Sequence, residues 1–202
     1  MRRTEKEAKI TREHLLDAAL VVFCQRGYGE TRLEDIASFA GVTRGAVYHH
    51  FGGKPEIYSA LLNERYSYIT HALEATLRQG GTPLEVLQRF LTRAIEYLEE
   101  DVEYHSIQDL VLFKTGYSLE LKEALAQKTK SQQYLMVFIT GLIRRAVESG
   151  EIRTDIDPRD TALAAIGLVN GVSLLWLFDP DSFSLQERAG RVVDTFIHGL
   201  LP

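Results

Sequence analysis

The stretch that decides the fold is GVTRGAVYHHFGGK, residues 41–54. Gly41 interrupts one short helical segment, and Thr43 is a residue type that favours the position just before a helix. The helix that starts there is expected to end at Gly52-Gly53, because glycines commonly terminate helices. The residues before the stretch, from Leu33, also have the apolar spacing of a short helix. Two short helices joined by a tight glycine turn form a helix-turn-helix.

The second of these helices has one face for packing and one face for a ligand. Val47 and Phe51 are four residues apart, so they are expected to pack against the preceding helix. The residues that project outward are Arg44, Gly45, Tyr48 and His49. Glycine costs about 1 kcal/mol relative to alanine inside a helix, which favours a place where the backbone approaches another molecule. Because the second helix of a helix-turn-helix enters the major groove amino end first, duplex DNA is the predicted ligand.

Two other interpretations of this stretch compete with DNA binding. His49 and His50 could suggest a metal ion, but adjacent helical residues point about 100° apart, and no carboxylate or cysteine stands at ligand spacing. We therefore predict no metal site and no cofactor. A solvated face without any ligand is the second alternative, and the residues alone leave it open.

Charge is unevenly distributed along the 202 residues. Residues 1–54 carry nine basic and seven acidic side chains, and the remainder has a net charge of −7. A mildly basic end on an acidic body is compatible with DNA binding at that end. The single cysteine, Cys24, excludes an internal disulfide framework and favours a reducing cytoplasm. The charged start, MRRTEKEAKITREH, lacks the apolar segment of a secretory signal.

Almost every periodic segment has the helical period and none has the pattern of a strand, so the chain is predicted to be all-α with about nine helices. Residues 1–54 are expected to form a head with the helix-turn-helix at about 32–51, and residues 55–202 a separate C-terminal domain. A helix over 54–77, stopped by Gln79-Gly80-Gly81, would connect the two.

Local signals also predict where several helices begin and end. Thr31 and Glu34 have the spacing of a capping box, as do Thr82 and Glu85. The other expected ends are a cap at Thr11, a left-handed residue at Gly27, a cap at Asp157 and a solvated acidic end at 99–101.

The last two helices raise the question of oligomeric state. The run from Ala162 to Phe178 falls short of the roughly 18 apolar residues of a membrane-spanning helix, so a buried or interface helix is predicted. Pairing it and the final helix, from about Ser184, with their copies across a two-fold axis would make a four-helix bundle. The predicted dimer interface comprises Gly167, Gly171, Leu174, Leu185, Val192, Val193, Phe196 and Ile197. A helix buried within a single chain remains the alternative.

The segment TREHLLDAALVVFCQRGYGETRLEDIASFAGVTRGAVYHHFGGKPEIYSALL resembles the DNA-binding domain of the TetR family of bacterial repressors. The resemblance rests on Ile-Ala, Ala-Gly-Val and Gly-x-x-Tyr-x-His-Phe, followed by lysine, and a domain of this type would cover residues 9–69. The segment GLVNGVSLLWLFDPDSFSLQERAGRVVDTFI is similar to the AcrR-type branch, which controls multidrug efflux pumps.

This resemblance implies an all-α homodimer that binds a palindromic operator in double-stranded DNA. It implies release of the DNA when a small-molecule effector, lipophilic or aromatic, binds the C-terminal effector-binding and dimerisation domain. It places Arg44, Gly45 and His49 at or near base edges. The phosphate contacts would be Thr31, Thr43, Tyr48 and Lys54, and Arg32 completes the predicted DNA-binding set.

Candidates for the effector site are polar or aromatic residues on otherwise apolar stretches. They are Tyr66, Tyr104, His105, Gln108, Phe113, Tyr134, Phe138, Asn170 and Trp176. Ordinary packing is the alternative for each, and Asn170 is the strongest candidate because it lies within the most apolar stretch. No nucleophile–base–orienter set, HExxH motif or phosphate loop indicates an enzyme. A regulator of the same fold that responds to a partner protein instead of a small molecule remains open.

Overall fold

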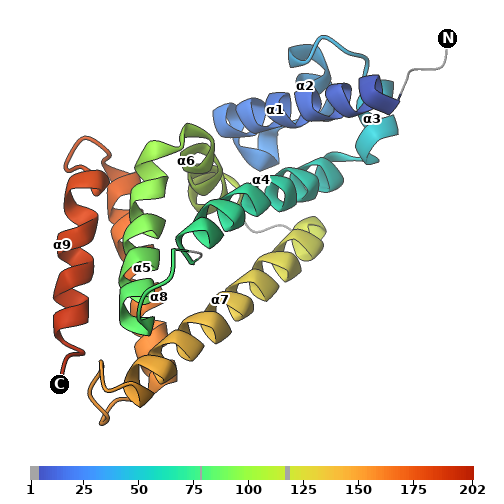
Figure 1. Cartoon of the computed structure of the whole chain (residues 1–202). Helices are drawn as coiled ribbons and strands as arrows, with labels where there is room; N and C mark the ends of the chain where they lie inside the picture. Colours follow the sequence, from blue (N-terminus) through green and yellow to red (C-terminus); the bar gives the residue numbers. More distant parts are fainter. Residues whose placement is uncertain (1–4, 78, 117–118) are drawn as a thin grey trace. The chain divides into compact units, whose positions relative to one another are not determined.

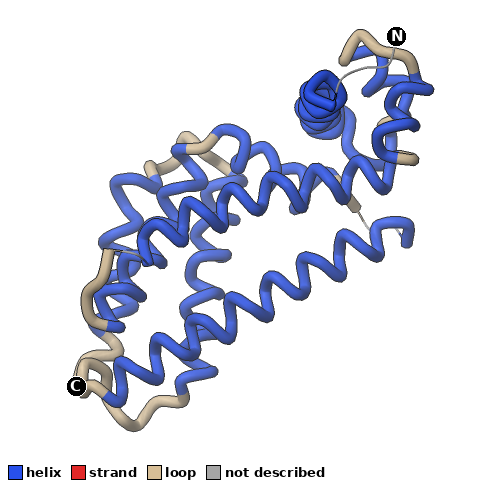
Figure 2. The backbone as a smooth tube through the Cα atoms, turned by 45° about the vertical axis from the view of Figure 1, so that its right-hand side comes forward, coloured by secondary structure: helices blue, strands red, loops and turns tan. Residues whose placement is uncertain are grey.

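In the computed structural model, the described residues are 5–77, 79–116 and 119–202, with side chains described for 7–65, 79–116, 120–122 and 129–202. Regular structure within these ranges is entirely helical, as predicted (Figures 1 and 2). The same ranges hold nine α-helices, a short π-helical segment at Leu110–Lys114 and a 3₁₀ turn at Leu119–Leu121. The all-α prediction is therefore confirmed.

The chain folds as two compact units. The head unit comprises Met1–Ser67 and Glu103–Gln127, and the body unit comprises Tyr68–Val102 and Lys128–Pro202. Two long helices, α4 (Lys54–Leu77) and α7 (Lys122–Glu148), contribute residues to both units. The predicted helix over 54–77 is confirmed, and its continuous backbone connects the helix-turn-helix to the body unit.

The head unit is built on an aromatic cluster. It contains α1 (Glu5–Glu30), α2 (Leu33–Phe39), α3 (Arg44–Phe51), the first part of α4 and nearly all of α6 (Val102–Asp109). The rings of Phe23, Tyr28 and Tyr58 have centroids 5.0 to 5.6 Å apart and are almost fully buried. Large buried rings contribute much of the hydrophobic stabilisation of so small a unit. This core supports α2 and α3, which contact each other and contribute buried Ile36 and Val47 to it.

The body unit is held together by α5 (Pro83–Glu100) against α8 (Pro158–Phe178) and α9 (Leu185–His198). Leu87, Leu91 and Ile95 recur every four residues on α5 and are completely buried, which is the helical spacing of a single packed face. The facing residues of α9 are Leu185, Ala189, Val193 and Ile197. A buried polar contact fixes the register of the two helices, because Gln88 Nε2 donates to Asp194 Oδ1 at 2.6 Å.

Three predicted helix starts are confirmed. The Thr43 hydroxyl accepts a hydrogen bond from the Ala46 amide at 3.2 Å and caps α3. Thr82 and Glu85 form a reciprocal capping box at α5, and Asp157 accepts the first amides of α8. Each signal lies within four residues of the helix it starts, so these ends are determined by local hydrogen bonding.

Two other predicted helix starts are wrong. Helix α1 begins at Glu5, so Thr11 lies inside it and donates its hydroxyl to the Glu7 carbonyl. Helix α2 has Arg32 as its N-cap, and the Asp35 carboxylate accepts the Arg32 amide at 2.8 Å. Thr31 is only 1% exposed and donates to the Gly27 carbonyl at 2.7 Å. Gly27 has a positive φ of 79°, as predicted, and its departure from helical geometry leaves its carbonyl without a helical partner. The Thr31 hydroxyl donates to that carbonyl instead of accepting the Glu34 amide.

The acidic end of α5 was expected to be solvated, but one of its carboxylates is bound within the chain. The Glu99 carboxylate accepts hydrogen bonds from Ser184 Oγ at 3.0 Å and from the Gln186 amide at 2.7 Å. Glu99 therefore supplements Ser184, the N-cap of α9, where a negative charge is favourable. The expectation was wrong because the partners lie more than 80 residues further along the chain.

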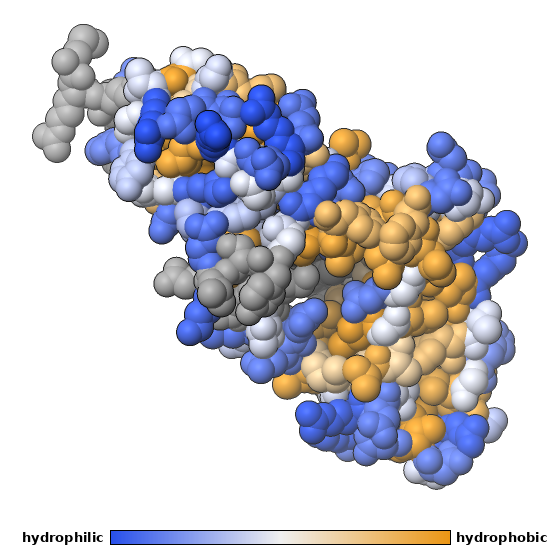
Figure 3. Space-filling view, turned by 180° about the vertical axis from the view of Figure 1, so that it is seen from behind, coloured by the Kyte–Doolittle hydropathy of each residue, from blue (hydrophilic) through white to orange (hydrophobic). Residues whose placement is uncertain are grey.

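Helix α8 presents much of its apolar surface outside the chain. Its 21 residues are, by length and composition, long and apolar enough to cross a membrane, so the expected shortfall in length is wrong. Only 28% of its most apolar window is buried, and Leu175 and Phe178 are 64% and 68% exposed. Figure 3 shows apolar side chains gathered in a broad area on the side opposite to that of Figure 1. An apolar area of this kind marks a contact surface.

Candidate nucleic-acid interface

The turn between α2 and α3 is short and closed by backbone hydrogen bonds. The Ala40 amide donates to the Ile36 carbonyl, and the Val42 amide donates to the Ala37 carbonyl, both at 2.9 Å. Gly41 has a φ of 66°, which side chains other than glycine adopt only with strain. The turn therefore orients α3 on α2 and ends at the Thr43 cap, which is exposed.

Helix α3 separates a packed face from an open face. Val47 is completely buried, while Arg44, Gly45, Tyr48 and His49 are all exposed. A Cβ added at Gly45 would meet only the Thr43 hydroxyl, at 3.9 Å, so packing within the chain does not require glycine there. The open face combines a guanidinium, a phenol, an imidazole and bare backbone, which are groups that bind base edges and phosphates.

Arg44 is held loosely on this face. Its Nη1 lies 2.7 Å from Glu34 Oε1, and both side chains are more than half exposed. An exposed pair of this kind contributes only about 0–1 kcal/mol. The guanidinium can therefore exchange Glu34 for a guanine or a phosphate at little cost.

Thr31 and Lys54 are engaged within the chain. Thr31 is buried, and its hydroxyl is donated to Gly27. Lys54 Nζ donates to the Tyr28 carbonyl at 3.0 Å and lies 4.3 Å from the centre of the Tyr28 ring. These contacts tie the start of α4 to the end of α1, whereas Arg32 is exposed just before α2. Phosphate contacts by Thr31 and Lys54 remain predictions of the resemblance.

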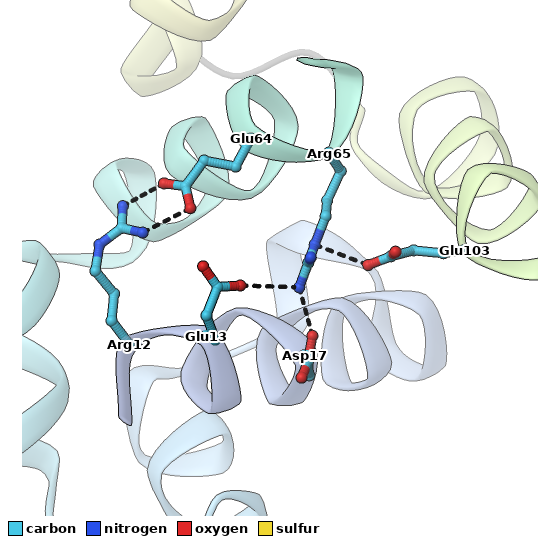
Figure 4. A network of polar contacts seen from close by, with 6 residues as sticks. All are labelled: Arg12, Glu13, Asp17, Glu64, Arg65 and Glu103. Carbon is cyan, nitrogen blue, oxygen red and sulfur yellow. Dashed lines mark hydrogen bonds and ion pairs between the residues drawn. The ribbon is translucent and has the colours of Figure 1, made fainter. Parts of the chain in front are cut away.

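A network of charged side chains lies behind the helix-turn-helix (Figure 4). Arg12 on α1 forms a bidentate pair with Glu64 on α4, and the adjacent Arg65 pairs with Asp17 on α1 and Glu103 on α6. Hydrogen bonds to Glu64 raise the pKa of the Arg12 guanidinium, against the smaller effect of burial. These residues could not be identified from the sequence, because partners about 50 residues apart give no local signal.

The predicted effector residues fall into different parts of the fold. Tyr104, His105, Gln108 and Phe113 belong to the head unit, and Tyr134, Phe138, Asn170 and Trp176 to the body unit. The side chain of Tyr66 lies outside the described residues.

Only some of these residues have the environment expected of a binding site. Gln108 Nε2 donates to the Tyr104 hydroxyl at 2.6 Å, and burial raises the pKa of that phenol. Phe138 packs against Phe90 at 5.6 Å, and Trp176 is buried. Tyr134 and Asn170 are exposed on the single chain, so neither side chain is buried in a way that would require a polar partner within the chain.

The predicted dimer residues differ in exposure. Leu185, Val193 and Ile197 are buried against α5 within the chain. Val192 and Phe196 are half-buried, and Gly167, Gly171 and Leu174 are exposed on α8. Among the described side chains, no three His, Cys, Asp or Glu residues are grouped closely enough to hold a metal ion.

Comparison with known proteins agrees with this geometry. Residues 15–61 match the family model of "Bacterial regulatory proteins, tetR family", and residues 82–201 match that of the "MAATS-type transcriptional repressor, C-terminal region". The HTH-type transcriptional regulator TtgR of Pseudomonas putida is 32% identical over 196 residues, which are 96% of this chain and 93% of the relative.

Two solved structures share both the fold and part of the sequence. NalD, the secondary repressor of the MexAB-OprM multidrug efflux pump in Pseudomonas aeruginosa, matches with a TM-score of 0.86 and 28% identity over 98% of each chain. A SmeT–triclosan complex matches with a TM-score of 0.81 and 27% identity over 96% of this chain and 92% of the other. The chain therefore belongs to the TetR family, with a MAATS-type C-terminal region, and is a DNA-binding transcriptional repressor rather than an enzyme.

Proposed function

We propose that this repressor controls an efflux pump or another transporter, and that a lipophilic or aromatic small molecule releases it from a palindromic operator. The observation that carries the DNA-binding part is the open face of α3, where Gly45 leaves bare backbone beside Arg44 and Tyr48. The efflux role is supported by NalD, described as a repressor of a multidrug efflux pump. The ligand class is supported by the SmeT structure, which contains triclosan.

In the proposed complex, α3 enters the major groove with its amino end first. The Thr43 cap and the free amides beside it would contact a phosphate, which the helix dipole also favours. Arg44 would leave Glu34 for guanine acceptors or a phosphate, with Gly45 and His49 close to the base edges. Tyr48 would donate its hydroxyl to the DNA backbone.

The proposed functional form is a homodimer that pairs α8 and α9 with their copies. Leu163, Leu174, Leu175 and Phe178 supply exposed apolar surface on α8, and a second copy would cover it. Dimerisation explains why a helix this apolar is so little buried in the single chain. A dimer also matches the two-fold symmetry of a palindrome, because two α3 helices would read half-sites about one helical turn apart.

Effector release is proposed to work by a shift between conformations. A ligand that binds better to a form with lower DNA affinity draws the protein into that form. A coupling of about 1–3 kcal/mol would weaken operator binding about 5–150-fold. Tyr104 and Gln108, which already contact each other, are the first pair to substitute in locating the site. Because the operator would be chromosomal, the proposed location is the cytoplasm.

Two measurements on the same protein test the proposal. Triclosan and a panel of other lipophilic and aromatic compounds are added in thermal unfolding scans, and a ligand at 100 times its dissociation constant should stabilise the protein by about 2.7 kcal/mol. The stabilising compound should then weaken operator binding, followed by fluorescence anisotropy. If operator DNA is bound but no compound changes either quantity, the alternative regulator that responds to a partner protein is favoured.

A further inference from the structure

Arg12 joins α3, the helix proposed to read DNA, to α4. Its Nη1 donates to Glu64 Oε2 at 2.6 Å, and its Nη2 donates to Glu64 Oε1, so the pair is bidentate. The Arg12 guanidinium carbon also lies 5.0 Å from the centre of the Phe51 ring. Phe51 is the last residue of α3. One side chain of α1 therefore contacts both the end of α3 and the helix that follows it. Figure 4 shows the pair with Glu64.

The geometry of this contact restricts the end of α3. A planar guanidinium paired at both of its terminal nitrogens has a fixed orientation, and its place over an aromatic ring restricts that ring in turn. Phe51 needs such a restraint because Gly52, the next residue, has a φ of 93° and is a point where the chain direction can change. The Arg12 and Glu64 side chains are each 33% exposed, so water screens this contact less than a fully exposed pair.

The carboxylate partner is itself held in place by the next residue of α4. Arg65 is 11% exposed and lies 2.5 Å from Asp17 and 3.6 Å from Glu13, both on α1. Its Nε lies 2.7 Å from Glu103 at the start of α6. Glu64 and Arg65 of α4 thus form ion pairs with successive turns of α1 (Figure 4). These pairs limit the positions that the Glu64 carboxylate can take.

We propose that Arg12 and Glu64 are positioning residues for DNA recognition, which hold Phe51 and thereby the end of α3 in the pose that reads the operator. This inference rests on the proposed DNA-binding role of α3. Arg12 does not contact the DNA, because its guanidinium is already occupied by the Glu64 carboxylate and the Phe51 ring. Two arginines of the head unit thus have different proposed roles. Arg44 would contact the DNA, and Arg12 would hold α3 in position.

The sign of one substitution separates positioning from simple electrostatics. Glu64→Gln removes a negative charge from a DNA-binding protein, so long-range electrostatics alone would strengthen binding to every duplex. Positioning predicts the opposite for the operator, a loss of about 5–30-fold, because fewer molecules hold α3 in the reading pose. Binding to a scrambled duplex of the same length should stay the same or increase slightly. Glu30→Gln makes the same charge change on an exposed residue of α1 and should not weaken operator binding.

A second variant distinguishes positioning from a phosphate contact. Arg12→Lys keeps the charge but loses the bidentate pair with Glu64 and the guanidinium over the Phe51 ring. Operator affinity should fall about 5–30-fold while the dependence of log K on log salt keeps the parent's slope. Loss of a direct phosphate contact would instead reduce the slope by about 1. Arg12→Lys combined with Glu64→Gln should cost no more than the larger single effect, because both break the same contact.

Hydrogen exchange tests the restraint without DNA. The Gly52 amide donates to the Tyr48 carbonyl at 2.9 Å at the end of α3, and Glu64→Gln should speed its exchange about tenfold while the Leu91 amide in α5 is unchanged. If the parent binds no operator, the proposed function fails, and this exchange result still decides whether the contact restrains α3. The inference is overturned if Glu64→Gln strengthens operator and scrambled binding alike, if Arg12→Lys lowers the salt slope, or if Gly52 exchange is unchanged.

Discussion

Gly41 and Gly45 lie four residues apart in the helix-turn-helix, and different constraints act on them. Gly41 has a φ of 66°, so its backbone conformation strains any other residue type. Gly45 is helical, and a Cβ added there would make only an ordinary contact with the Thr43 hydroxyl. The first glycine serves the fold, whereas the second weakens the helix, a cost that the proposed contact with DNA would explain.

Alanine substitutions separate these two roles. Gly41→Ala should lower the free energy of unfolding by about 1–2 kcal/mol, because alanine must adopt a left-handed backbone. Gly45→Ala should raise it by up to about 1 kcal/mol, because alanine favours the helix, yet it should weaken operator binding through its methyl group. Urea unfolding and fluorescence anisotropy measure the two effects. A Gly45→Ala protein that is more stable and binds the operator like the parent would show that α3 does not approach DNA at this residue.

Among the contacts between helices, the hydrogen bonds that join the end of α5 to the start of α9 can be tested by substituting a single residue. Glu99 accepts two hydrogen bonds from the first turn of α9, where a carboxylate also complements the helix dipole. Glu99→Gln should therefore lower the free energy of unfolding by about 1–2 kcal/mol in urea titrations. Glu100→Gln is the matched control, because its ion pair with Arg93 lies within α5 and does not reach α9, and it should change stability by less than about 0.5 kcal/mol. Equal effects of the two variants would contradict this assignment.

The helices differ in how far their ends could be predicted from sequence. The starts at Thr43, Thr82 and Asp157 were predictable, because the capping group and the amide it accepts are neighbours in the chain. The start of α2 was not, because Gly27 leaves the helical conformation and engages Thr31. Contacts between distant residues, such as Arg12 with Glu64, depend on packing that no local pattern encodes.

The candidate site divides in the same way. The outward face of α3 lies opposite Val47, which is buried, and the helix begins directly after the glycine turn. Its exposed residues were therefore predictable. The internal bonds of Thr31 and Lys54 were not. Thr31 bonds to Gly27 because that residue leaves helical geometry, and Lys54 bonds to Tyr28, which lies 26 residues earlier in the chain. The effector residues were the least predictable, because a binding site draws on several helices at once.

At the scale of the whole molecule, the account depends on self-association through α8. Leu175→Glu together with Phe178→Glu places two charges on its exposed apolar surface and should convert a micromolar dimer to monomers in sedimentation experiments. Operator affinity should fall with it, because a monomer engages only one half-site. Leu112→Glu, also exposed but in the head unit, should leave the dimer intact. A parent protein that is monomeric at micromolar concentration would contradict the proposed dimer.

Helix α3 is proposed to read the sequence of duplex DNA, and a competition titration measures this property. Fluorescence anisotropy with the promoter beside the protein's own gene, and with a scrambled duplex of equal length, gives the ratio of specific to non-specific affinity over a range of salt concentrations. We expect a ratio of about 10³ or more at physiological salt, which falls when Arg44 is replaced by alanine. Equal affinity for the two duplexes, with Arg44→Ala indistinguishable from the parent, would contradict it.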